Sequence, residues 1–132
     1  MTIKAILPTI EPSETLSTAN PDLRKTVQVG DAEIAYIDIG EGDPIVFMHG
    51  NPTSSFLWRN VIPHVQGMGR IIVPDFIGHG WSSTSPREAY HFNDNIEYFD
   101  AFIDGLNLTK NLILVLHDWG AAVGFYRAAR FS

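Results

Sequence analysis

Asp118 stands where a buried strand should turn sharply into a helix. The run Leu112–Leu116 is apolar, and the small residues of Ala121–Gly124 would let the following helix pack closely against a sheet. This layout is typical of a nucleophile elbow, which usually presents a serine. Because an aspartate is already ionised at neutral pH, it needs no base to become nucleophilic.

A carboxylate nucleophile favours one type of target. Attack on an ester or amide would give a labile anhydride, whereas attack on a saturated carbon with a leaving group gives an alkyl ester. We therefore predict that Asp118 is a nucleophile that forms a covalent alkyl ester. The alternative is that this residue is only a helix N-cap, a position that aspartate often occupies.

Two further residues could stabilise a departing anion. Asn51 follows His49-Gly50 directly after an apolar run at Ile45–Met48, and Trp119 follows the aspartate. Their backbone N–H groups would form an oxyanion hole, and the Asn51 amide and Trp119 indole could hold the leaving group. Neither side chain supplies a proton, so the leaving group should be a halide rather than an alkoxide. Taken alone, Asn51 could be a turn residue and Trp119 a core residue.

The surrounding pattern predicts the elements that position these residues. Strands are expected at Lys25–Val29, Glu33–Ile39, Ile45–Met48, Arg70–Val73 and Leu112–Leu116. A helix is expected around residues 57–65, and Pro63 would end it early. A second helix should follow an N-cap at Asn93, and a third should span Trp119–Phe131. Residues 1–24 read as an extended arm. Early hairpin strands followed by alternating strands and helices indicate an α/β sheet covered on both faces.

Three loops should meet at the carboxyl edge of the parallel strands, where α/β sheets place their sites. The middle loop contains Asp75, Gly78 and Gly80, which we interpret as residues that shape it, and His79, which could approach the site. Trp81 is either a rim aromatic or a pocket wall. The other histidines are interpreted as structural or surface residues: His49, His64, His91 and His117.

Composition excludes several classes of function. Hydrophobic residues make up 45% of the 132 residues and charged residues 18%, which is typical of a globular chain. The net charge of −6 argues against nucleic-acid binding, and the absence of cysteine excludes disulfides and thiolate metal sites. No run has the pattern of a signal peptide or the length of a membrane span, so we expect a soluble cytoplasmic protein.

The motifs resemble those of haloalkane dehalogenases in the α/β-hydrolase superfamily. The resemblance covers residues 26–130 and is strongest in Gly42–Asn60, Pro74–Gly78 and His117–Gly120. Soluble epoxide hydrolases and Renilla-type coelenterazine luciferases share the last motif. Epoxide hydrolases usually have an aromatic residue at the position of Asn51, and Pro52 favours the dehalogenases over the luciferases.

The resemblance implies an α/β-hydrolase fold in which Asp118 attacks a haloalkane and Asn51 and Trp119 hold the halide. The products would be an alcohol, a halide ion and a proton, with no metal or organic cofactor. Four residues depart from the family pattern in ways expected to alter local packing or the pocket rim. They are Leu116, His79, Trp81 and Asn95.

The resemblance also places several parts of the enzyme beyond Ser132: the base histidine, its acidic partner, the helical cap and the last three strands. A complete domain needs roughly 200–250 residues. Residues 25–132 are therefore predicted to be the N-terminal part of an α/β hydrolase, with five strands, unable to turn over alone. Leu112–Leu116 would be an aggregation-prone edge that a complementing chain or self-association could cover. A binding module built on a dead hydrolase half is the non-enzyme alternative.

Overall fold

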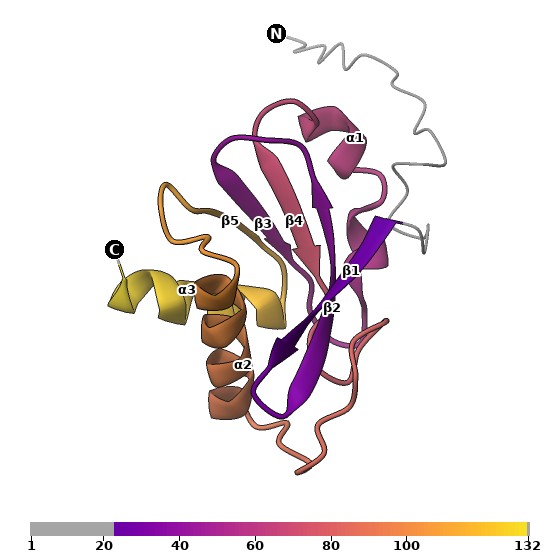
Figure 1. Ribbon diagram of the computed structural model, residues 1–132, viewed down its shortest axis with the longest axis vertical. Helices are drawn as coiled ribbons and strands as arrows, with labels where there is room; N and C mark the ends of the chain where they lie inside the picture. The colour runs from indigo at the N-terminus through magenta and orange to yellow at the C-terminus, as the bar shows by residue number, and fades with distance from the viewer. Residues whose placement is uncertain (1–22, 132) are drawn as a thin grey trace, which may run out of the picture.

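The computed structural model describes residues 23–131, in which five strands alternate with helices in the predicted order (Figure 1). The strands are β1 Arg24–Val29, β2 Ala32–Ile39, β3 Pro44–Met48, β4 Arg70–Pro74 and β5 Ile113–Leu116. The helices are the 3₁₀ helix η3 Ser55–Trp58 and the α-helices α1 Ile62–Val65, α2 Phe92–Gly105 and α3 Trp119–Arg130. Every predicted strand is confirmed to within one residue at each end. Of the predicted arm, residues 1–22 lie outside the described residues and Arg24 belongs to β1.

The strands form one mixed sheet in the order β1-β2-β4-β3-β5. The first hairpin turns at Gly30, whose φ of 60° suits a two-residue connection, and β2 pairs antiparallel with both β1 and β4. Strand β3 pairs in parallel with β4 on one side and with β5 on the other. The three parallel strands therefore end at the same edge of the sheet, as the sequence predicted.

Helices cover both faces of this sheet because the central strands are apolar on both sides. On one face, Phe102 and Ile103 of α2 and Val123 of α3 pack with residues of β2, β3 and β4. On the other face, Trp58 of η3 and Ile62 of α1 join a second core cluster. Figure 1 shows α2 and α3 together on one side and α1 on the other.

One arginine joins the two covering helices α2 and α3, and another joins two strands of the sheet. The buried Arg127 of α3 donates to Asp100 of α2 at 2.8 Å and to Asp104 at 3.1 Å. Arg70 of β4 makes two hydrogen bonds to the carboxylate of Asp38 in β2, at 2.9 and 2.7 Å. Such bidentate pairs add directional constraints to the apolar packing.

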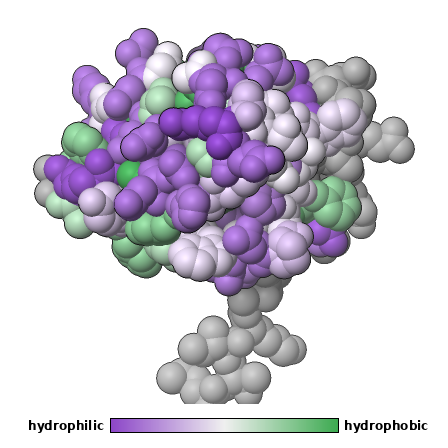
Figure 2. Space-filling model, turned by 90° about the horizontal axis from the view of Figure 1, so that it is seen from below, coloured by the Kyte–Doolittle hydropathy of each residue, from purple (hydrophilic) through white to green (hydrophobic). Residues whose placement is uncertain are grey.

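Strand β5 lies at the edge of the sheet, and Ile113 is 51% exposed. The expectation of an exposed apolar edge is therefore confirmed. Helix α3, which follows it, also exposes Phe125 and Tyr126. Seen from below, the molecule is largely hydrophilic, and its hydrophobic residues form separate groups (Figure 2).

Two details of the helices were predicted wrongly. Pro63 does not end a helix: it lies in the first turn of α1, where a missing N–H costs nothing, and the predicted single helix is divided into η3 and α1. Helix α2 begins at Phe92, so Asn93 lies inside it and is not its N-cap. There the Asp94 carboxylate accepts the backbone N–H of His91 at 3.0 Å, which stabilises the earlier start. Within residues 23–131, no helix combines the length and apolarity that crossing a bilayer requires.

Candidate active site

The turn between β5 and α3 has the strained backbone of an elbow. Asp118 adopts φ 55° and ψ −125°, a conformation that non-glycine residues rarely adopt, and its side chain makes no capping hydrogen bond to α3. Asp118 is thus the N-cap residue of α3 by position, as the alternative interpretation expected, but its side chain does not cap the helix. Close packing makes the sharp turn possible, because a Cβ at Gly120 would lie 2.5 Å from the carbonyl oxygen of His49.

Leu116 departs from the family pattern without distorting this turn. Its side chain lies over Gly124 of α3, where an added Cβ would meet the Leu116 side chain at 2.4 Å. The glycine therefore provides the room that the larger leucine requires. The small residues after the elbow act as predicted, by allowing close approach of α3 to the sheet.

The exposed Asp118 carboxylate is held by the first loop. Its Oδ2 atom accepts the backbone N–H of Asn51 at 3.0 Å. The backbone N–H groups of Trp119 and Asn51 next to the carboxylate lower the pKa of Asp118 below its ordinary value. Gly50 leaves the space for this contact, since a Cβ there would lie 2.4 Å from both Cβ and Oδ2 of Asp118.

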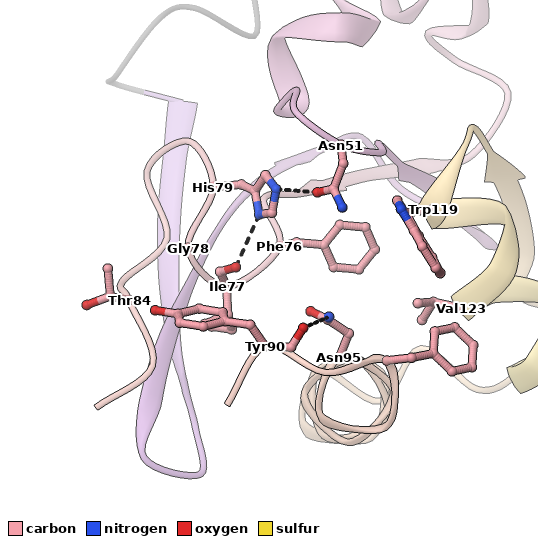
Figure 3. A pocket seen from close by; sticks show the side chains of 11 residues that line it. Asn51, Phe76, Ile77, Gly78, His79, Thr84, Tyr90, Asn95, Trp119 and Val123 are labelled. Atoms are coloured by element: carbon pink, nitrogen blue, oxygen red, sulfur yellow. Dashed lines mark hydrogen bonds between the residues drawn. The ribbon is translucent and has the colours of Figure 1, made fainter. Parts of the chain in front are cut away.

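A cavity of about 370 Å³ has Asn51 and Trp119 in its lining, whereas Asp118 is not among the lining residues (Figure 3). It is lined by Asn51, Phe76, Ile77, Gly78, His79, Thr84, Tyr90, Phe92, Asn95, Trp119 and Val123. The three predicted loops therefore converge on one pocket. Trp119 is 51% exposed, which excludes its interpretation as a core residue. The amide nitrogen of Asn51 and the indole nitrogen of Trp119 lie at the same end of the pocket.

His79 is the site residue whose role the sequence did not resolve. Its Nε2 lies 2.6 Å from Oδ1 of Asn51, and its Nδ1 lies 3.1 Å from the backbone oxygen of Ile77. The ring is therefore held between the pocket asparagine and its own loop. Its place on the second rim loop was a signal, but the contact depends on how two loops fold toward each other.

The buried His49 is a structural residue, as predicted. Its Nε2 accepts the backbone N–H of Phe76 at 2.9 Å, so Nδ1 is the protonated nitrogen that donates to the backbone oxygen of Gly50 at 2.8 Å. Burial lowers the pKa of this imidazole. The neutral ring joins the first loop to the second and is not exposed to a substrate.

The predicted loop-shaping role of Asp75 is confirmed by its contacts. This fully buried carboxylate accepts the backbone N–H of Ser55 at 2.7 Å and of Trp81 at 3.0 Å. Gly80 packs against it, because an added Cβ would lie 2.5 Å from the carboxyl carbon. Trp81 is 60% exposed with the Arg24 guanidinium over its ring, so it is a rim residue and not a pocket wall.

The remaining predicted residues lie around the site or away from it. His64, His91 and His117 are exposed and none of them lines the cavity. Asn95 does line it, and its amide donates to the backbone oxygen of His91 at 3.1 Å. In the described part of the chain, no cluster of three or more His, Cys, Asp or Glu side chains could hold a metal ion.

The sheet, the elbow at Asp118 and the loops at the carboxyl ends of the parallel strands together define the class of protein to which the chain belongs. The family model of the alpha/beta hydrolase fold matches residues 43–132, and the chain belongs to that family.

Within this family, the chain is similar to haloalkane dehalogenases. It is 47% identical over 110 residues to the haloalkane dehalogenase of Sphingobium indicum strain UT26, and 48% identical over 106 residues to that of Mycolicibacterium smegmatis. These alignments cover 81% and 78% of this chain but only 37% and 34% of the relatives.

The similarity extends to solved structures. The haloalkane dehalogenase DatA from Agrobacterium tumefaciens C58 superposes with a TM-score of 0.77 at 43% identity, over 81% of this chain and 36% of that protein. The chain thus spans little more than a third of the length of the relatives that it matches.

Proposed function

We propose that this chain provides the nucleophile and halide-binding part of a haloalkane dehalogenase. The observation that carries the proposal is the hydrogen bond from the Asn51 backbone N–H to Oδ2 of Asp118. It joins the first and third rim loops and holds a carboxylate of lowered pKa next to Asn51 and Trp119, which line the pocket although Asp118 itself does not. The identity to haloalkane dehalogenases at 45–48% supports the same chemistry.

The first step follows from the geometry of the carboxylate. The Asn51 N–H holds Oδ2, so the second oxygen, Oδ1, attacks the carbon that bears the halogen. A carbon–oxygen bond forms, the carbon–halogen bond breaks, and the bonding electron pair leaves with the halide. The Asn51 amide and Trp119 indole N–H groups then receive the halide, and neither has to give up a proton.

The resulting alkyl ester keeps its carbonyl oxygen beside the backbone N–H of Asn51. The same N–H group that positions the nucleophile would therefore stabilise the oxyanion during hydrolysis. Hydrolysis also needs a base to activate water, and the resemblance assigns that base to a segment after Ser132. We infer that residues 25–132 complete alkylation but release alcohol only with a complementing C-terminal segment.

Intact and peptide-level mass spectrometry after incubation with 1-bromobutane tests this proposal. A persistent butyl group mapped to Asp118, with an equal amount of released bromide, is the expected result. A folded chain that gains no adduct from any bromoalkane would contradict the proposal. Alkylation by styrene oxide but not by bromobutane would indicate epoxide chemistry instead.

A further inference from the structure

The ring of His79 faces two oxygen atoms. Nε2 lies 2.6 Å from Oδ1 of Asn51, and Nδ1 lies 3.1 Å from the backbone oxygen of Ile77. An amide oxygen only accepts hydrogen bonds, so Nε2 of His79 is the donor to Oδ1 of Asn51. This is the shorter of the two contacts, and the ring needs only the proton on Nε2 to hold the amide.

The contact to His79 also determines which end of the Asn51 amide faces the pocket. With Oδ1 held by the ring, the amide nitrogen points away from His79 toward the end of the pocket where the Trp119 indole nitrogen lies (Figure 3). If the amide turned over, Oδ1 would face the pocket and repel an anion. The histidine therefore selects between a pocket with two donors and one with a donor and an acceptor.

We propose that His79 is a positioning residue for the halide site: it holds the Asn51 amide with its nitrogen toward the anion. This inference rests on the proposed function and adds a determinant of anion affinity to it. His79 also lines the cavity, so its ring lies close to the place where the anion would bind.

The charged and titratable groups around His79 come from each parallel strand. His49, which follows β3, has its ring centroid 5.3 Å from that of His79. It is already committed to Gly50 and Phe76, and its pKa is lowered, so it stays neutral. Asp75 after β4 is buried with backbone partners, and Asp118 after β5 bonds the backbone of Asn51. These neighbours are therefore committed to other partners, and the Asn51 amide is the group that Nε2 of His79 is placed to hold.

The test is nitrogen-resolved NMR of the full chain, in which bromide is titrated against the wild type and two variants. His79→Phe keeps a ring against Phe76 but has no donor, while His79→Gln can donate to Oδ1 of Asn51. We expect His79→Phe to weaken bromide binding about tenfold and His79→Gln to restore most of it. The exposed His64→Gln is the matched control and should bind like the wild type.

Two readouts separate this inference from the proposed function. The wild-type spectrum should show the N–H of His79 Nε2 hydrogen-bonded to Oδ1 of Asn51. His79→Phe should lose this signal and shift the Asn51 side-chain amide signals even without bromide. Unchanged amide signals and unchanged affinity in His79→Phe would overturn the inference. Absent bromide binding in a wild type whose amide still depends on His79 would instead count against the halide site.

Discussion

Two aspartates follow parallel strands at the same edge of the sheet, and the structure uses them in opposite ways. Asp75 after β4 is fully buried and accepts backbone N–H groups from Ser55 and Trp81. Asp118 after β5 is exposed, adopts a positive φ and bonds the backbone N–H of Asn51. Each carboxylate also packs against a glycine, Gly80 or Gly50, at which an added Cβ would clash with the aspartate side chain.

Residue type and position after a parallel strand are therefore not enough to predict a nucleophile. Both carboxylates receive backbone N–H groups, which stabilise their charge. Asp75 is buried and contacts Arg24, so its carboxylate connects β1 with the first and second loops. Exposure and the strained turn leave Asp118 able to meet a substrate. Substitutions can test this difference between Asp75 and Asp118, and the largest effect is expected at Asp118.

Asp118→Asn should abolish the butyl adduct. The substitution keeps the size of the side chain and tolerates positive φ, but it removes the negative oxygen that attacks. Mass spectrometry after incubation with 1-bromobutane measures the effect, with circular dichroism to confirm the fold. An adduct that forms at the wild-type rate would show that another residue is the nucleophile.

Asn51→Ala should slow alkylation of Asp118 by about 10²–10³-fold, because it removes a side-chain donor to the leaving halide and keeps the backbone N–H. The rate of adduct formation with 1-bromobutane is the measurement. Asn60→Ala, which removes an exposed asparagine from the same segment, is the matched control. A rate within about twofold of the wild type would contradict the halide role of Asn51.

Asp75→Asn should reduce stability rather than chemistry. The change removes a buried charge beside Arg24 and places an amide donor against backbone N–H groups, so the free energy of unfolding should fall by about 3 kcal/mol. Urea unfolding measures it, with the exposed Glu41→Gln as control. The folded fraction should still be alkylated at Asp118. A variant as stable as the wild type that has lost alkylation would reverse the assignment of the two aspartates.

Lowering the pH should leave alkylation unchanged over a wide range. The N–H groups of Trp119 and Asn51 hold the pKa of Asp118 below its ordinary value of 3.8, so the reactive carboxylate persists as the medium becomes acidic. Adduct rates measured in short incubations between about pH 3.8 and 6 should stay above half of their neutral-pH value as long as the chain stays folded. A rate that has fallen to half at or above pH 3.8 would show that the carboxylate lacks this stabilisation.

Much of the fold could be predicted because its signals are local. The apolar run of β3 and the apolar residues on both faces of β2 predict strands whatever surrounds them, and small residues after Asp118 predict the elbow. Local patterns gave wrong predictions where the same residue is compatible with two different structures. Pro63 can end one helix or begin the next, and the structure chooses the second because its ring is tolerated in a first turn.

By itself, the sequence determined the strands, the order of the elements and the three loops that carry Asn51, His79 and Asp118, because periodicity and turn residues act over a few positions. Only the tertiary structure decided that β3 lies between β4 and β5 and that the Asn51 N–H reaches Asp118. It also decided that His79 holds the amide of Asn51. These contacts join residues 28 to 67 positions apart, and they depend on which strands become neighbours when both faces of the sheet are buried.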